Sequence, residues 1–89
     1  MAKYEILIKR SAAKEIEELP QKKIRKQVVD RIQALTENPR PPGCEKLSGF
    51  EKYRIRQGNY RVLYEIRDRE LVVFVVKVGH RREVYRRTT

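Results

Sequence analysis

The sequence lacks most of the residues on which disulfide, metal and cofactor chemistry depend. It has no tryptophan, one cysteine, Cys44, and one histidine, His80. A single cysteine excludes an intramolecular disulfide, which suits a reducing compartment, and no zinc-like set of cysteines and histidines can form. Phosphate-cradling glycine loops and nucleophile elbows are also missing. We therefore expect neither a metal nor a cofactor.

Long hydrophobic runs are absent as well. No stretch approaches the roughly 20 apolar residues that a membrane span requires. The first residues do not resemble a signal peptide, because the apolar run from Tyr4 to Ile8 is short and interrupted by charge. A length of 89 residues fits one domain. These features predict a single cytoplasmic domain, residues 1–89, that does not enter a membrane.

Positive charge is what the sequence has in excess. There are 22 lysines and arginines against 12 aspartates and glutamates, so the formal net charge is +10. Residues 46–89 carry 12 of the basic residues, mostly arginine, and only 5 of the acidic ones. Arginine suits bidentate recognition of phosphate and carboxylate groups better than lysine does. The composition predicts a polyanion or an acidic protein as the partner, against the alternative of a merely well-solvated basic surface.

The first half of the chain has the periodicity of a strand followed by two helices. Residues 3–9 alternate as a strand does. Ser11 is expected to cap a first helix, and Pro20 to lie in the first turn of a second. An apolar stripe marks that second helix, made of Ile24, Val28, Ile32 and Leu35. The two segments read as a helical hairpin that ends at the proline-rich loop 38–43.

After the proline-rich loop the period changes to two. Residues 53–57 and 60–66 alternate on either side of Gly58 and Asn59, and residues 71–76 are apolar on both sides. A further short strand is expected around residues 45–47. The order β-α-α-β-β-β(-β) predicts an α+β fold, with an antiparallel sheet and the helical hairpin packed on one face.

The predicted hairpin gathers arginines on one face of the sheet. If Gly58 and Asn59 form the turn, Arg56 lies directly opposite Arg61. Alternation then places Arg54 on the same face as both, away from the helices. Like charges in opposed positions destabilise a sheet, and a merely solvated face would be better served by alternating signs. We therefore predict an anion site, against the alternative of a charged, solvated face.

A second basic cluster follows the last strand. It contains His80, Arg81, Arg82 and Tyr85. Histidine is the side chain whose ordinary pKa allows proton transfer near neutrality, and a tyrosine ring can stack on a nucleobase. Taken alone, such a cluster is typical of a solvated chain end. Its convergence with the arginines of the hairpin favours a shared site.

Three segments together are similar to the RelE/ParE superfamily of toxins from type II toxin–antitoxin systems. They are Lys46-Leu47-Ser48-Gly49, residues 53–66 (YRIRQGNYRVLYEI) and residues 78–85 (VGHRREVY). The resemblance covers nearly the whole chain and implies a RelE-like fold. Basic residues and a tyrosine in the tail favour the RelE-like branch, whose members are messenger RNA interferases.

The resemblance implies a function and its partners. RelE-like toxins cleave mRNA in the ribosomal A site without a metal: the 2′-hydroxyl attacks the adjacent phosphate and leaves a 2′,3′-cyclic phosphate and a 5′-hydroxyl end. A cognate acidic, RelB-like antitoxin would neutralise the toxin and form a hetero-oligomer with it.

The resemblance also assigns roles to individual residues. Arg54 and Arg56 match the two basic residues of the family's first active-site strand, and Arg61 the arginine that steadies the phosphate. Arg81 or Arg82 matches the tail arginine, and Tyr85 the tyrosine that stacks on a base. Lysine occupies the positions of Arg54 and Arg56 in well-known RelE toxins, and arginine is a poor base. Either His80 transfers the proton, or the reaction relies on charge stabilisation and positioning.

Two other functions stay open at this point. One is a ParE-like toxin that inhibits DNA gyrase by binding, without nuclease activity. The other is a non-catalytic RNA-binding module. A pure binding poison would not require the arginine set together with the tail from His80 to Tyr85, which is why we rank the endoribonuclease first.

Overall fold

The computed structural model describes residues 3–47 and 51–80, which form two helices and five strands. Neither helix is long and apolar enough to cross a membrane. The elements follow one another along the chain as β1 (Glu5–Ile8), α1 (Arg10–Glu17), α2 (Lys22–Ala34), β2 (Glu45–Leu47), β3 (Lys52–Gln57), β4 (Tyr60–Arg67), a 3₁₀ turn (Asp68–Glu70) and β5 (Val72–His80). This order confirms the predicted α+β fold, including the short strand at residues 45–47.

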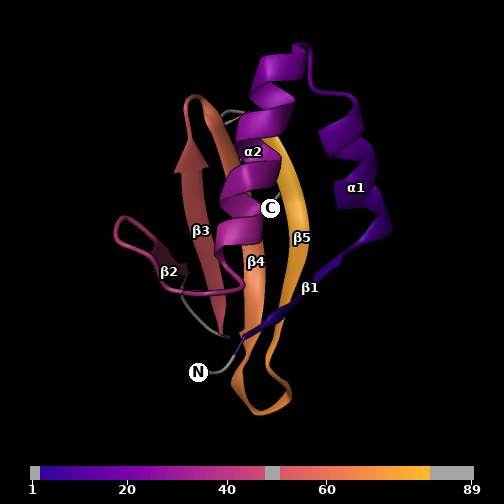
Figure 1. The fold of residues 1–89 in the computed structure, drawn as a ribbon. Coiled ribbons are helices and arrows are strands. Elements are labelled where there is room, and N and C mark those ends of the chain that lie inside the picture. The colour runs from indigo at the N-terminus through magenta and orange to yellow at the C-terminus, as the bar shows by residue number, and fades with distance from the viewer. Residues whose placement is uncertain (1–2, 48–50, 81–89) are drawn as a thin grey trace.

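The five strands form one sheet in the order β1-β5-β4-β3-β2 (Figure 1). Strands β2 to β5 pair antiparallel with their neighbours, but β1 runs parallel to β5, so the sheet is mixed rather than wholly antiparallel. Strands β3 and β5 are both antiparallel to β4, so these two strands point the same way. The helices and β2 return the chain so that β1 also has this direction, and β5 therefore pairs with β1 in parallel.

Helix α1 begins earlier than its expected cap, and helix α2 begins later than its expected first turn. Helix α1 starts at Arg10, so Ser11 lies within its first turn and Lys9 holds the N-cap position without a side-chain hydrogen bond. Helix α2 starts at Lys22, and Pro20 precedes it. The apolar faces of the helices, rather than these caps, fix their place, because packing dominates helix stability in a folded protein.

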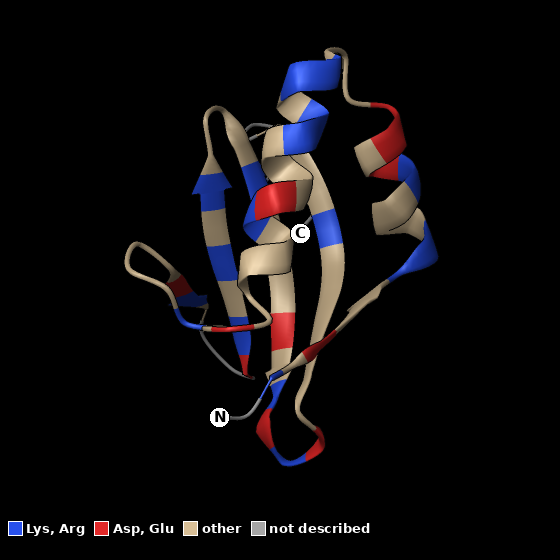
Figure 2. Ribbon diagram, viewed as in Figure 1, with Lys and Arg blue, Asp and Glu red and all other residues tan. Residues whose placement is uncertain are grey.

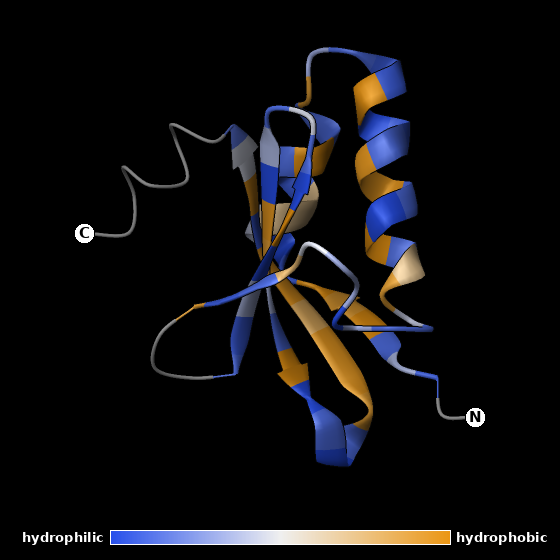
Figure 3. Ribbon diagram, turned by 90° about the vertical axis from the view of Figure 1, so that its left-hand side faces the viewer, coloured by the Kyte–Doolittle hydropathy of each residue, from blue (hydrophilic) through white to orange (hydrophobic). Residues whose placement is uncertain are grey.

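The core lies between the helices and one face of the sheet (Figure 3). As predicted, α2 buries Val28 and Ile32 with Leu35 just beyond its end, and Ile24 packs against them half-buried. The sheet contributes residues that alternate along β3, β4 and β5, namely Tyr53, Ile55, Val62, Tyr64, Ile66, Val73, Val75 and Val78. The opposite, outer face of the sheet is covered by neither helix.

Strand β5 contains a bulge that changes which side chains share a face. Tyr64 pairs with Val75, but the preceding residue Leu63 pairs with Lys77, so Val76 is an extra residue in β5. One extra residue reverses the alternation beyond it. Val78 therefore returns to the core, where it is buried beside its partner Val62.

A polar cluster joins three distant segments at the end of the sheet farthest from the β3–β4 turn. The Tyr4 hydroxyl donates to Asp68 Oδ1 over 2.7 Å, and Arg40 Nη2 lies 2.9 Å from Asp68 Oδ2. Arg40 Nε also donates to the Tyr53 hydroxyl, which itself donates to Glu51. Hydrogen bonds from Arg40 and then from Tyr4 lower the pKa of the Asp68 carboxyl. The cluster fastens the proline-rich loop to the first strand and to the β4–β5 turn.

Candidate functional site

The β3–β4 hairpin has the register that its turn residues predict. Gly58 has a φ of +61° while Asn59 has no positive φ, which is the pattern of a type II′ turn. Gln57 pairs with Tyr60, and Arg56 pairs with Arg61. Because side chains alternate along a strand, Arg54, Arg56 and Arg61 all lie on the outer face of the sheet. We call these three residues the arginine face.

The arginine face combines one exposed and two largely buried arginine side chains. Basic residues recur along β3 and reappear at the start of β4 (Figure 2). The side chain of Arg56 is 60% exposed, that of Arg54 only 11%, and Arg61 is buried at 8%. Covering a guanidinium lowers the local dielectric, which strengthens its hydrogen bonds to an anion. This face can therefore both attract a phosphate and hold it firmly.

Glu45 on the edge strand β2 lies against the arginine face. It is the cross-strand partner of Arg54, and its Oε1 accepts from Arg54 Nη2 at 2.7 Å and lies 3.4 Å from Arg56 Nη2. Hydrogen bonds from Arg54 and Arg56 lower the pKa of the Glu45 carboxyl, so it is ionised at neutral pH. Glu45 was not among the predicted site residues, although the short strand expected at residues 45–47 was the signal that could have found it.

His80 lies on the other side of the sheet from the arginine face. Simple alternation from Val75 would put His80 on the outer face, but the bulge reverses it and pairs His80 with Tyr60. The two rings meet edge to face, with centroids 5.6 Å apart. Tyr60 is half-buried against the core, so His80 shares its side of the sheet. The expectation that His80 shares the face of Arg61 is thus not met.

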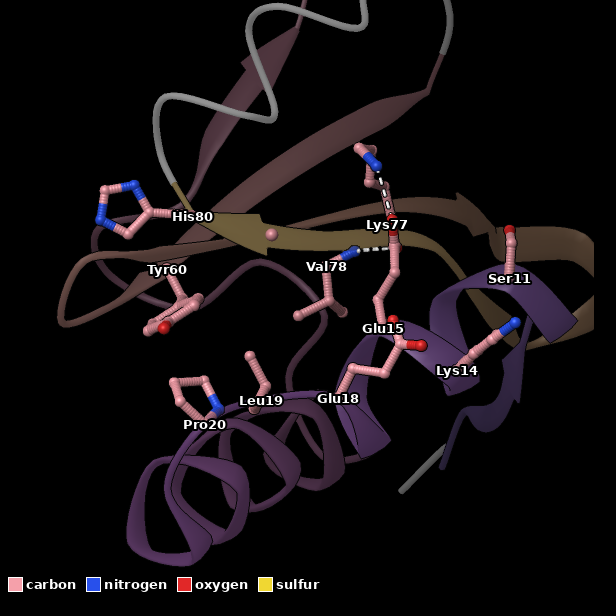
Figure 4. A pocket seen from close by; sticks show the side chains of 11 residues that line it. Ser11, Lys14, Glu15, Glu18, Leu19, Pro20, Tyr60, Lys77, Val78 and His80 are labelled. Atoms are coloured by element: carbon pink, nitrogen blue, oxygen red, sulfur yellow. Dashed lines mark hydrogen bonds and ion pairs between the residues drawn. The ribbon is translucent and has the colours of Figure 1, made fainter.

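Tyr60 and His80 line a hollow of about 620 Å³ between β5 and the end of α1 (Figure 4). Glu15 of α1 also lines the hollow, and its carboxylate accepts from Lys77 Nζ at 2.6 Å and from the backbone N–H of Val78 at 3.0 Å. Here β1 no longer pairs with β5, so Glu15 satisfies a backbone donor at the open edge. The hollow mixes acidic, basic and apolar side chains.

The tail residues of the predicted site, Arg81, Arg82 and Tyr85, lie outside the described residues. The structure thus brings together Arg54, Arg56 and Arg61, adds Glu45 to them, and separates His80 by the thickness of the sheet. Chemically, the three guanidinium groups can bind a phosphodiester and stabilise the extra negative charge that develops when a nucleophile attacks it. None of the three can accept a proton near neutrality.

The sequence matches toxins of type II toxin–antitoxin systems. The family model described as the ParE toxin of type II toxin–antitoxin systems matches residues 6–85. A putative RelE-like toxin protein of Escherichia coli is 30% identical over 82 residues, which cover 89% of this chain and 84% of the relative. The mRNA interferase toxin RelE of Escherichia coli K12 is 36% identical over 67 residues, 70% of each chain.

Solved structures with the same fold include toxins bound to antitoxins. RelE in the archaeal RelE–RelB complex of Pyrococcus horikoshii superposes with a TM-score of 0.79 and 27% identity, covering 89% of this chain and 96% of the other. The RelBE2 toxin–antitoxin complex of Mycobacterium tuberculosis matches with a TM-score of 0.78 and 26% identity, covering 90% of this chain and 93% of the other. The isolated Escherichia coli RelE toxin matches with a TM-score of 0.75 and 28% identity, covering 99% of this chain and 100% of the other.

Proposed function

The chain belongs to the RelE/ParE superfamily of type II toxin–antitoxin toxins, and on this basis we propose that it is a metal-independent endoribonuclease that cleaves mRNA on the ribosome. The observation that carries the proposal is the arginine face, on which Arg54, Arg56 and Arg61 converge on one surface of the β3–β4 hairpin. A relative that is 36% identical is named an mRNA interferase. Three guanidinium groups supply the positive charge that phosphate chemistry requires.

The proposed reaction transfers the phosphate within the RNA strand. The 2′-hydroxyl gives up its proton to water as its oxygen forms a bond to the adjacent phosphorus. The bond from phosphorus to the 5′-oxygen breaks, and the leaving 5′-oxygen takes a proton from water. The products are a 2′,3′-cyclic phosphate and a 5′-hydroxyl end. Arg61 and Arg54 would bind the non-bridging oxygens from a largely covered position, and Arg56 would meet the strand from solvent.

The tail completes the proposed site. Following the resemblance, we assign Arg81 or Arg82 a further phosphate contact and Tyr85 a stacking contact with a base. Proton transfer by His80 stays a prediction, and the contact of His80 with Tyr60 argues for a packing role instead. The reaction then depends chiefly on positioning and charge stabilisation.

We further propose that a cognate acidic antitoxin of the RelB kind binds this toxin in the cytoplasm. RelE toxins similar to this chain have been solved in complex with RelB antitoxins. A net charge of +10 would speed the encounter with an acidic partner, and the rate would fall as salt rises. Co-expression with the neighbouring open reading frame tests this: a free, toxic protein with no co-purifying acidic partner would contradict it.

A ParE-like gyrase inhibitor is the second candidate, because the matching family model is that of ParE. Brief induction in cells, followed by mapping of mRNA 5′ ends and an assay of plasmid supercoiling, separates the two. The nuclease should produce new 5′-hydroxyl ends within coding regions and leave supercoiling unchanged. Altered supercoiling with intact mRNA would instead identify a gyrase inhibitor.

A further inference from the structure

Glu45 already contacts the groups that the proposed function assigns to the RNA phosphate. One carboxylate oxygen, Oε1, accepts from Arg54 Nη2 at 2.7 Å and approaches Arg56 Nη2 at 3.4 Å. The pair with Arg54 is also a directly opposed cross-strand pair between β2 and β3. A carboxylate and a phosphate compete for such N–H donors, because guanidinium groups bind both through the same geometry.

The position of Glu45 in the sheet lets its side chain move while the arginines stay. Strand β2 has three residues and, within residues 3–47 and 51–80, lies at the edge of the sheet beside β3. The side chain of Glu45 is 47% exposed, whereas that of Arg54 is 11% exposed. A half-exposed side chain on an edge strand can rotate into water at small cost, while the covered guanidinium of Arg54 keeps its place.

We propose that Glu45 is an internal substitute for the RNA phosphate, which holds Arg54 and Arg56 in their binding positions and is displaced when RNA binds. This inference rests on the proposed function of the arginine face. Before RNA arrives, Glu45 offsets part of the repulsion among three clustered positive charges. When the strand binds, the phosphate takes over those hydrogen bonds, so Glu45 lowers the affinity for RNA while it orders the arginines.

Glu45→Gln is the variant that tests the proposal. An amide oxygen can still accept a hydrogen bond from Arg54, but the negative charge is gone. The matched control is Glu65→Gln. Glu65 lies on β4 and forms an ion pair with Arg67, and its substitution changes the net charge by the same amount. The probe is a short 2′-O-methyl RNA oligonucleotide, which offers phosphates but no attacking hydroxyl. Its dissociation constant is measured by fluorescence anisotropy at fixed salt.

We expect Glu45→Gln to bind the oligonucleotide about threefold to tenfold more tightly than the wild type, and Glu65→Gln to differ by less than about twofold. Equal or weaker binding by Glu45→Gln would overturn the proposal. Unchanged binding with slower single-turnover cleavage would do so as well, because Glu45 would then act on the reaction rather than on binding. If the wild type and both variants fail to bind, the arginine face is not a phosphate site and the proposed function fails with it.

A measurement on the wild-type protein covers the case in which Glu45→Gln does not fold. Side-chain carboxyl ¹³C signals are followed by NMR while the 2′-O-methyl oligonucleotide is added. The Glu45 signal should move as the carboxylate leaves the arginines, and the Glu65 signal should move much less. Binding of the oligonucleotide with a stationary Glu45 signal would overturn the proposal and leave the phosphate site intact.

Discussion

Arg56 and Arg61 lie directly opposite each other on neighbouring strands, so the hairpin holds two like charges in one cross-strand pair. Such a pair is unfavourable for the sheet, by a few tenths of a kcal/mol. An anion bound between the two side chains at the proposed phosphate site would offset this repulsion. Loss of the exposed charge, that of Arg56, should therefore lower function without lowering stability.

Arg56→Gln separates these two effects because its side chain is exposed. We expect single-turnover cleavage to fall by about tenfold to a hundredfold, the loss of one charge-assisted phosphate contact. The free energy of unfolding should stay within about 0.5 kcal/mol of the wild type or rise, since repulsion is relieved. Arg67→Gln at the far end of β4 is the control and should change neither. Full activity in Arg56→Gln would remove this residue from the site.

Arg61 requires a different substitution because it is buried. Arg61→Ala should abolish toxicity but also cost about 1–2 kcal/mol of stability, since the aliphatic part of the side chain packs in the sheet. Arg61→Met keeps most of that volume, so it should fold near wild-type stability and still lose at least about tenfold in cleavage. Urea unfolding and single-turnover assays on both variants provide the test. A folded, fully toxic Arg61→Met would exclude Arg61 as a phosphate ligand.

His80→Gln tests whether the only histidine transfers a proton. Because the bulge in β5 pairs His80 with Tyr60, away from Arg61, we expect less than about a tenfold fall in single-turnover rate. The pH–rate profile should keep its shape. A fall of about 10²–10⁴ with an altered profile would instead place the imidazole at the reacting phosphate.

Asp68→Asn tests the polar cluster that joins Tyr4, Arg40 and the β4–β5 turn. Hydrogen bonds from Arg40 and Tyr4 lower the pKa of Asp68 in the folded protein. A carboxyl with a lowered folded pKa stabilises the fold above its unfolded pKa, near 4, and this contribution is lost as the pH falls through the folded pKa. Asp68→Asn should therefore be less stable than the wild type at pH 7, and the difference should shrink as the pH falls through the lowered pKa of Asp68.

Urea unfolding at a series of pH values measures that difference. Glu70→Gln, an exposed residue of the same turn, is the control and should follow the wild-type curve. A constant gap between Asp68→Asn and the wild type from pH 2 to pH 7 would show that the carboxylate charge is not what stabilises the cluster.

The hairpin was predictable because its determinants are local. Gly58 fixes the turn, and the alternation on either side leaves one register that buries Ile55 and Val62 together. Once that register is set, the face of Arg54, Arg56 and Arg61 follows. The apolar stripe of α2 was predictable for the same reason, since its spacing already defines the buried side.

Features that depend on distant pairing were not predictable. The contact of Glu45 with Arg54 requires β2 to pair with β3 across a loop, and nothing in the local pattern sets that register. The position of His80 depends on Val76 being an extra residue, which the nearly continuous apolar run of residues 71–76 does not reveal. The parallel pairing of β1 with β5 is likewise a property of the whole chain.

The pairing of β1 with β5 also sets when, during its own synthesis, this protein can become harmful. Residues 5–8 are made long before their partners, residues 72–75. Such long-range pairing cannot form before both segments are available, so the sheet is completed only after the codons of β5 have been translated. A ribosome producing the toxin has therefore passed those codons before the product can fold and act.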